Sequence, residues 1–318
     1  MHELVTIVIP VYNRPQLLRR AVASALAQTY RPIEVVIVDD GSTDDTPAAI
    51  AALSAAHHEV RGVRQDNSGP GAARETGRLA ARGAFLQFLD SDDLLLPSKL
   101  ELQMRAFENT PEAGVAYGRT RYRDASGREI ACTWKPLLDG ERTIFPTFLR
   151  ARAWETVTPL YRASVCAAAG PWTRLRLEED WEYDCRIAAL GTTLAFVPEM
   201  VAEHSDEAPD RLSRGHALDA TRLRDRARAH ALILEHARRA GITNQQPEMQ
   251  HFARELFLLA RQCGAAGLPD QSRMLFALAR NASQQPETVQ FRAYSALARI
   301  LGWTLTGRMA CLSDRLRW

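Results

Sequence analysis

The stretch Phe85-Leu86-Gln87-Phe88-Leu89-Asp90-Ser91-Asp92-Asp93 is the most informative part of the chain, because an apolar strand runs directly into three carboxylates. No basic residue stands among them. Neighbouring like charges cannot all stay ionised without a counterion. Carboxylate oxygens suit hard cations such as Mg²⁺ or Mn²⁺, which keep positions open for water or phosphate oxygens. The stretch therefore predicts a divalent-metal site, or else a solvated acidic loop that caps the helix beginning near Pro97.

The sequence around this stretch alternates short β-rich runs with helical stretches. The predicted strand and helix pairs are 5–10 with 15–28, 33–39 with 43–55, 60–65 with 71–81, and 84–89 with 97–109. The runs 6–9 and 35–38 are apolar on both faces, which is typical of a parallel sheet covered by helices on each side. Ligands of such α/β sheets bind at the carboxyl ends of the strands.

The later part of the chain has a different pattern. We predict a hairpin of 115–123 with 129–134, a strand near 156–161, a helix around 179–190 and a strand at 193–197. After about residue 215 no strand-like segment is visible, and apolar residues recur at helical spacing. We therefore expect an α/β domain over residues 1–210, with halves at about 1–114 and 115–210, followed by a C-terminal α-helical bundle over 211–318.

The composition is that of an ordinary globular protein, with 318 residues, 46% hydrophobic and 25% charged. The five cysteines are scattered and show no C-x-x-C pair, so neither a disulfide framework nor a zinc site is indicated. The chain shows no secretory signal and no apolar run long enough to span a bilayer. We expect a reducing, cytoplasmic setting and no nucleic-acid partner.

Two more strand ends carry polar residues. The first strand ends in Pro10-Val11-Tyr12-Asn13-Arg14, and the second in Val38-Asp39-Asp40-Gly41-Ser42-Thr43-Asp44-Asp45-Thr46. A carboxylate there can accept from a base N–H, an aromatic ring can stack on the base, and Gly41 allows close backbone approach. Part of the second segment is also expected to cap the next helix. Capping does not explain the doubled Asp39-Asp40.

The third strand leads into Gln65-Asp66-Asn67-Ser68-Gly69-Pro70-Gly71-Ala72-Ala73-Arg74. This segment offers a turn, a helix N-terminus and a cation for a diphosphate, although Arg74 fits an exposed helix position equally well. The first strand is not followed by Gly-x-Gly-x-x-Gly, and the chain has no Gly-x-x-x-x-Gly-Lys-Ser/Thr. The dinucleotide fold and the phosphate loop are therefore excluded.

Taken together and in this order, Pro-Val-Tyr-Asn, Val-Asp-Asp-Gly-Ser-Thr-Asp, Gln-x-Asn-x-Gly-x-x-x-Ala-Arg and Asp-x-Asp-Asp resemble a family 2 glycosyltransferase of the GT-A fold, over about residues 4–205. The resemblance implies a mostly parallel sheet flanked by helices. It implies that Asp90 contacts the ribose side and that Asp92 binds the metal. It also implies that Pro10, Tyr12 and Asp40 contact the nucleotide base. The residues that it implies for nucleotide-sugar binding are Pro10, Tyr12, Asn13, Asp40, Arg74, Asp90 and Ser91.

A fifth block, Leu177-Glu178-Glu179-Asp180-Trp181-Glu182-Tyr183-Asp184-Cys185-Arg186, is similar to the Glu-Asp pair and later Arg that family members carry at a helix start. Inversion at an anomeric carbon requires a base that removes the proton of the acceptor hydroxyl. The resemblance assigns that role to Asp180, and it assigns Glu179 to orient Asp180 or to touch the acceptor. The alternative is an acidic helix start that complements the helix dipole.

Two single residues complete the comparison with the family. His204 stands where relatives often place a histidine near the diphosphate or metal, so we assign it as a metal ligand or donor, against a purely structural role. Glu75 replaces the Asn that relatives usually carry after Ala-Arg. The Gln-x-x-Arg-Trp signature of processive synthases is absent from the sequence, which favours single transfer over polymerisation.

The C-terminal segment is basic, since residues 205–318 hold 17 Lys and Arg against 11 Asp and Glu. Residues 291–318 combine five arginines with Trp303, Trp318 and aliphatic side chains. Such a stretch fits an anionic membrane surface, where lipid-linked acceptors lie, or the core of the helical bundle. Gly302 and Gly307 interrupt its helical pattern.

From the resemblance we expect an inverting, metal-dependent glycosyltransferase that uses Mg²⁺ or Mn²⁺. It would move a sugar from a nucleotide-diphosphate donor, with a UDP-sugar favoured, to a hydroxyl of a glycan, glycolipid or other acceptor in cell-surface polysaccharide biosynthesis. The expected location is the cytoplasm, or its boundary with the inner membrane. A sugar-1-phosphate nucleotidyltransferase needs a Gly-rich basic loop after the first strand, which is lacking. A degenerate GT-A protein acting as a binding or interaction module remains the alternative.

Overall fold

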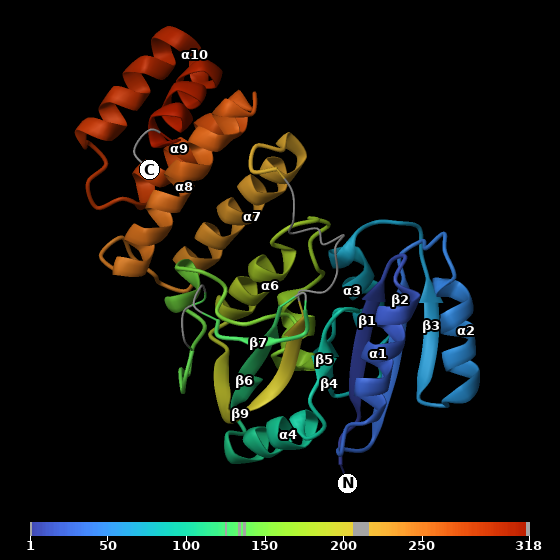
Figure 1. Cartoon of the computed structure of the whole chain (residues 1–318). Helices are drawn as coiled ribbons and strands as arrows, with labels where there is room; N and C mark the ends of the chain where they lie inside the picture. The colour runs from blue at the N-terminus through green and yellow to red at the C-terminus, as the bar shows by residue number, and fades with distance from the viewer. Residues whose placement is uncertain (1, 125, 133–134, 136–137, 206–215, 316–318) are drawn as a thin grey trace. The chain divides into compact units, whose positions relative to one another are not determined.

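The computed structural model describes residues 2–124, 126–132, 135, 138–205 and 216–315 (Figure 1). The chain divides into two compact units. The sheet unit comprises Met1–Ile144, Arg152–Leu175 and Leu190–Arg211, and the helical unit comprises Phe145–Ala151, Arg176–Ala189 and Leu212–Trp318. The expected domain boundary at residue 210 falls outside the described residues and stays a prediction.

The sheet unit is built on one sheet that has nine strands within the described residues. They are β1 (Val5–Val11), β2 (Ile33–Asp39), β3 (Val60–Arg64), β4 (Phe85–Phe88), β5 (Leu94–Leu95), β6 (Ala113–Arg123), β7 (Glu129–Ile130), β8 (Leu160–Arg162) and β9 (Thr193–Ser205). The order is β3-β2-β1-β4-β8-β6-β9-β5, with β7 paired to β6. Strands β3, β2, β1 and β4 are parallel, whereas β5, β7 and β8 pair antiparallel with their neighbours.

Helices cover both faces of the parallel strands. Within this unit they are α1 (Pro15–Leu26), α2 (Thr46–Ala56), α3 (Pro70–Ala80), α4 (Lys99–Asn109) and α5 (Ala163–Ala169). Ile7 belongs to the core cluster that contains Leu18 of α1. Val8 points at Gly77 of α3, where an added Cβ would lie 2.1 Å from a Val8 methyl group. Because neighbouring strand residues point to opposite faces, α1 and α3 lie on opposite sides of β1.

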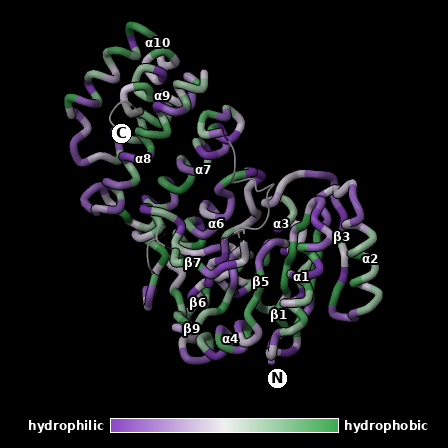
Figure 2. The backbone as a smooth tube through the Cα atoms, in the orientation of Figure 1, coloured by the Kyte–Doolittle hydropathy of each residue, from purple (hydrophilic) through white to green (hydrophobic). Residues whose placement is uncertain are grey.

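The helical unit contains a short 3₁₀ turn and five α-helices among the described residues. They are η1 (Thr147–Leu149), α6 (Glu179–Ala188), α7 (Ala220–Arg239), α8 (Pro247–Ala265), α9 (Pro269–Ala282) and α10 (Val289–Arg315). Rings of Phe257, Phe276 and Tyr294 meet at centroid distances of 5.1–5.8 Å and join α8, α9 and α10. The helices alternate between hydrophobic and hydrophilic residues (Figure 2), as amphipathic bundle helices do. The predicted α/β sheet and C-terminal helical bundle are confirmed.

Two differences from the predicted strands affect the acidic stretch. The strand expected at 193–197 continues to Ser205, and the sequence pattern gave no sign of β5. These two strands pair, with Leu94 opposite Glu203. The pairing brings the end of the acidic stretch beside His204. Among the described residues, no helix combines the length and the apolar character that a bilayer crossing requires.

Candidate functional site

The ends of β1 and β2 are joined through Asn13. Asn13 has a left-handed backbone with φ of 52°, a conformation that Asn tolerates better than most side chains. Its backbone N–H donates to Ser42 Oγ (2.9 Å), and its Oδ1 accepts from the Thr43 N–H (2.8 Å). The Ser42 N–H donates in turn to Asp39 Oδ1 at 2.8 Å. The two strand ends therefore form one connected edge, as the parallel pattern predicted.

Pro10 and Tyr12 lie on this edge with different exposure. Pro10 is buried in β1, whereas Tyr12 is 44% exposed just beyond the strand. An aromatic ring exposed at a strand end is suited to stack against a planar ligand. Base contacts by Pro10 and Tyr12 stay a prediction.

Asp40 is buried and bonded within the chain. Its Oδ1 accepts from Gln65 Nε2 (2.8 Å) and from the Ser68 N–H (2.8 Å), and its Oδ2 accepts from the Gly69 N–H (2.9 Å). The carboxylate thus holds the loop between β3 and α3. Its assignment to the base stays a prediction, and the sequence had not indicated the loop contacts.

Gly41 allows the close approach that the sequence suggested, and the approaching group is the chain itself. Its φ is 78°, and an added Cβ would lie 2.8 Å from the backbone nitrogen of Asn67. Only glycine suits both the left-handed backbone and this separation. The loop after β2 therefore lies directly against the loop after β3.

Arg74 and Asp90 meet across this edge, which supports placing both in one site. Arg74 Nη2 lies 2.6 Å from Asp90 Oδ1, and the guanidinium carbon lies 5.1 Å from the Trp172 ring centroid. The Arg74 side chain is only 4% exposed, whereas Asp90 is 30% exposed. Glu75, which replaces the expected Asn, accepts from the Trp172 N–H and pairs with Arg78. Glu75 thus holds the backbone of Trp172, whose ring lies against the Arg74 guanidinium.

The remaining carboxylates of the acidic stretch are also paired. Asp92 Oδ2 lies 3.3 Å from Arg14 Nη1, and Ser91 is buried. Asp93 Oδ1 lies 2.9 Å from His204 Nδ1. Burial raises the pKa of Asp93 to about 6, and His204 only partly offsets this effect. His204 therefore turns Nδ1 toward Asp93, and its role as a metal ligand stays a prediction.

The carboxylates at this edge would form a divalent-metal site only together with oxygen atoms of a bound substrate. Among the described residues, no three His, Cys, Asp or Glu side chains converge as a cation site. Magnesium-type ions are commonly held by one or two carboxylates plus substrate phosphates. Asp92 and the partly exposed Asp90 have oxygens of that kind, and the phosphate oxygens of a bound substrate would supply others.

The sequence-predicted catalytic pair lies at the start of α6, in the helical unit. Glu179 is buried, and Asp180 is half-buried with its Oδ1 accepting from the Trp181 N–H at 2.7 Å. Glu182, to which the sequence pattern assigns no role, has a side chain that is 1% exposed and lies 2.6 Å from Arg186. The base role of Asp180 stays a prediction.

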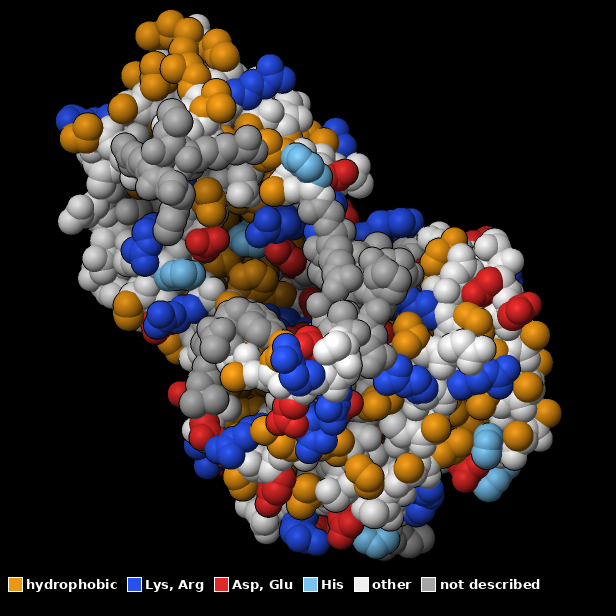
Figure 3. All heavy atoms as spheres, in the orientation of Figure 1, with side chains coloured by type: hydrophobic (Ala, Val, Ile, Leu, Met, Phe, Trp, Pro, Cys, Tyr) orange, Lys and Arg blue, Asp and Glu red, His pale blue; other side chains and the backbone are white. Residues whose placement is uncertain are grey.

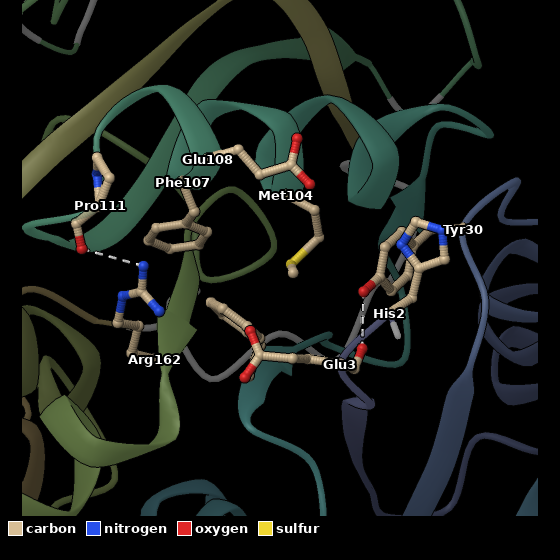
Figure 4. Close-up of a pocket in the computed structure, with 9 residues that line it drawn as sticks. His2, Glu3, Tyr30, Met104, Phe107, Glu108, Pro111 and Arg162 are labelled. Atoms are coloured by element: carbon tan, nitrogen blue, oxygen red, sulfur yellow. Dashed lines mark hydrogen bonds between the residues drawn. The ribbon is translucent and has the colours of Figure 1, made fainter.

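A separate cavity of about 220 Å³ lies near the amino end of β4 (Figure 4). Tyr30 closes one side and donates to the Glu3 carbonyl oxygen, and Arg162 on the other side donates to the Pro111 carbonyl oxygen. Phe85, the first residue of β4, lines it. Parallel α/β sheets bind ligands at the opposite, carboxyl end of their strands. The cavity is therefore distinct from the edge that the carboxyl ends of β1, β2 and β4 form, which we call the carboxylate edge.

Comparison with known proteins gives the family. The model of Glycosyl transferase family 2 matches residues 6–167. Chondroitin synthase of Escherichia coli is 36% identical over 184 residues, which cover 55% of this chain and 26% of that protein. The chain spans about a quarter of the length of several curated relatives that it matches.

Two solved structures share the fold. Staphylococcus aureus TarS 1-349 in complex with UDP-GlcNAc gives a TM-score of 0.73 at 17% identity, covering 98% of this chain and 91% of that one. Mannosyltransferase PcManGT from Pyrobaculum calidifontis in complex with GDP-Man and Mn²⁺ gives 0.53 at 20% identity, covering 99% and 88%. With the family match over half its length, the chain belongs to glycosyl transferase family 2.

Proposed function

We propose that the protein transfers a sugar from a nucleotide-diphosphate donor, with a UDP-sugar favoured, to an acceptor hydroxyl with inversion at the anomeric carbon. The observation that carries the proposal is the carboxylate edge, where Arg74 meets Asp90 at 2.6 Å, Asp92 meets Arg14 at 3.3 Å, and Tyr12 is exposed just beyond the end of β1. Such an edge offers a stacking ring, a fixed guanidinium and carboxylates, which match the base, the diphosphate and the ribose of one ligand.

The donor would be held by groups that the chain has already fixed. Trp172 and Asp90 hold the Arg74 guanidinium in place, so little conformational entropy is lost when it meets a phosphate. Asp40 fixes the loop that leads into α3, and so the first turn of that helix, beside the same edge. The base would stack on Tyr12, and Asp90 would accept from a ribose hydroxyl. UDP-GlcNAc bound to TarS and GDP-Man bound to PcManGT support a nucleotide sugar as donor.

The proposal includes Mg²⁺ or Mn²⁺, with Asp92 as the ligand from this chain and His204 nearby. A bound metal would neutralise the charge that develops on the diphosphate leaving group. In the structure Asp92 faces Arg14 at 3.3 Å, so Arg14 occupies the cationic position beside it. A metal would compete with this contact. The Mn²⁺ in the PcManGT complex supports this part of the proposal.

For the chemical step we assign Asp180 as the base that takes the proton from the acceptor hydroxyl, and Glu179 as the residue that orients it or meets the acceptor. Asp180 is half-buried at a helix start, where its Oδ1 already accepts one hydrogen bond. A partly desolvated, oriented carboxylate suits proton abstraction. The match to chondroitin synthase supports an acceptor in polysaccharide biosynthesis.

We further propose that α10 contacts an anionic membrane at its cytoplasmic face, where lipid-linked acceptors lie. Its exposed large apolar side chains are Val289, Leu297, Ile300, Leu301, Leu305, Met309 and Leu312. Arg292, Arg299 and Arg308 are exposed among them, and residues 289–313 contain no Asp or Glu. Hydrophobic side chains gather over α10 with basic residues beside them (Figure 3). Apolar area with an unopposed positive charge complements an anionic bilayer. The Arg317 and Trp318 of the predicted tail lie outside the described residues.

Calorimetric titration with UDP, dTDP and GDP, each with and without Mn²⁺, tests the donor proposal on the intact protein and on Asp92→Ala. We expect one nucleotide to bind in a metal-dependent way and the variant to lose that dependence. Binding that is equal with and without metal in both proteins would refute the assigned role of Asp92. Failure of all three nucleotides to bind would favour a degenerate interaction module.

A further inference from the structure

The residue before α6 is held in an unusual backbone conformation. Glu178 has φ of 60°, although it is neither Gly nor Asn. A left-handed backbone is unfavourable for such a residue and persists only where the surroundings hold it. Two contacts from α7 do so, since Glu178 Oε1 accepts from Arg226 Nε at 2.8 Å and its Oε2 lies 2.9 Å from His230 Nδ1.

The His230 ring is buried and is held by a stacked ring and by two contacts of its Nδ1 atom. It is 2% exposed and stacks on Phe252 of α8 at a centroid distance of 5.3 Å and an angle of 9°. Its Nδ1 lies 2.9 Å from the Glu178 carboxylate and 3.0 Å from the Arg226 carbonyl oxygen. Both neighbours are acceptors, so Nδ1 carries the hydrogen. The hydrogen bond itself goes to the Arg226 carbonyl oxygen, and the contact with the Glu178 carboxylate is electrostatic.

The same ring also meets the residue on the other side of the catalytic pair. The Trp181 ring lies 5.3 Å from His230 in an edge-to-face arrangement, and its indole N–H donates to the Phe148 carbonyl oxygen at 2.9 Å. Glu178 and Trp181 flank Glu179-Asp180 in sequence. We infer that His230 is a positioning residue that fixes Asp180 by holding both flanking residues. This inference rests on the proposed base role of Asp180.

A second histidine on α7 provides the contrast. His236 Nε2 lies 2.8 Å from Glu182 Oε1, and His236 is also buried. Glu182 keeps an independent partner within its own helix, because Arg186 reaches it one turn later at 2.6 Å. Among the described residues, the Glu178 carboxylate is contacted only from α7, through Arg226 and His230, and has no partner within α6. Loss of His236 should therefore leave the start of α6 in place.

The test compares His230→Phe, which keeps the ring and removes the donor, with His236→Phe as the matched control. We expect His230→Phe to lower kcat for donor turnover by roughly tenfold or more, while KM for the donor changes less than about twofold. His236→Phe should lower the unfolding free energy about as much as His230→Phe does, but it should change kcat little. His230→Asn, whose amide can donate near the Nδ1 position, should recover part of the loss.

Hydrogen exchange of the intact protein separates this inference from the proposed function. His230→Phe should speed amide exchange at residues 178–182 and leave residues 12–14 and 65–74 unchanged. If the wild type shows no turnover but this exchange pattern appears, the base role fails and the positioning stands. Equal kcat losses in both Phe variants, or unchanged exchange at 178–182, would overturn the inference.

Discussion

The carboxylate edge of the sheet unit and the start of α6 in the helical unit carry the two halves of the proposed chemistry, and they are built differently. The edge is assembled from strand ends that parallel pairing places side by side, with Asn13, Asp40 and Gly41 linking adjacent loops. The start of α6 is contacted by Arg226 and His230, which come from a helix about fifty residues later in the chain. The first arrangement follows from the sheet, whereas the second follows from helix packing.

The largest effect should come from Asp180→Asn. The variant keeps the shape of the side chain and removes its basicity, so kcat should fall by roughly 10²- to 10⁴-fold. Nucleotide affinity should stay within about twofold if the edge and the α6 start are functionally separate. Turnover measured beside calorimetric binding checks both. Unchanged kcat would remove Asp180 as the base.

A smaller effect is expected for Arg74→Lys. The ammonium group lacks the planar fork that meets Asp90 and lies against Trp172, so nucleotide-diphosphate affinity should fall by roughly tenfold. Arg78→Lys on the same helix serves as the control and should bind normally. An equal loss in both variants would indicate damage to α3 in general.

Gly41→Ala tests the edge through its backbone. The added methyl group meets the Asn67 nitrogen at 2.8 Å with φ at 78°, so we expect a loss of about 1–3 kcal/mol in unfolding free energy. Denaturant unfolding measures this loss. Gly140→Ala is the control, because its φ is 89° but no atom lies within 4 Å of its added Cβ. If the two variants lose the same stability, the loop contact contributes nothing beyond backbone strain.

The carboxylates around α6 predict how stability depends on pH. Burial alone would raise the pKa values of Glu178 and Glu182. His230 and Arg226 outweigh this effect at Glu178, and His236 and Arg186 outweigh it at Glu182. Both pKa values therefore lie below the ordinary value of 4.5. A carboxylate whose pKa is lowered in the folded state stabilises the fold fully when the pH is above its pKa in the unfolded chain. That stabilisation is lost as the pH falls through the lowered pKa of the folded state. The unfolding free energy should therefore decrease below pH 4.5, and Glu182→Gln should flatten the decrease. A wild-type curve that is flat there would contradict the assignment.

The smallest effect on the catalytic regions is expected at α10. Ile300→Glu places a negative charge on an exposed face, so co-sedimentation with phosphatidylglycerol vesicles should drop by roughly tenfold, with less than about 0.5 kcal/mol lost in stability. Ile300→Ala is the milder comparison. Equal binding to phosphatidylcholine vesicles, or no binding by the wild type, would argue against an anionic membrane as the partner.

The sequence predicted the edge well because its determinants are local. Strands apolar on both faces impose parallel pairing, and polar residues at their carboxyl ends must then converge, as Arg74 and Asp90 do. It could not show that Asp40 accepts three hydrogen bonds from a later loop, since loop geometry is not encoded in periodicity. Nor did it show that β9 extends far enough to pair with β5 and bring His204 to Asp93.

The start of α6 was predicted only as a motif. Glu179-Asp180 and Arg186 were recognised, but the left-handed Glu178 has no sequence signal, because Glu rarely adopts that conformation. His230 and His236 lie in a helical stretch, and no sequence motif distinguishes them from its other residues. Their role becomes visible only when α7 packs beside α6.

The most direct test of the central claim is to incubate the protein and Mn²⁺ with UDP-, dTDP- and GDP-sugars and to follow the released nucleoside diphosphate together with the anomeric configuration of the released sugar by ¹H NMR. We predict release from one donor class, with the sugar appearing first in the configuration opposite to that of the donor. Retained configuration would contradict the inverting mechanism, and binding without release from any donor would contradict the assignment as an active transferase.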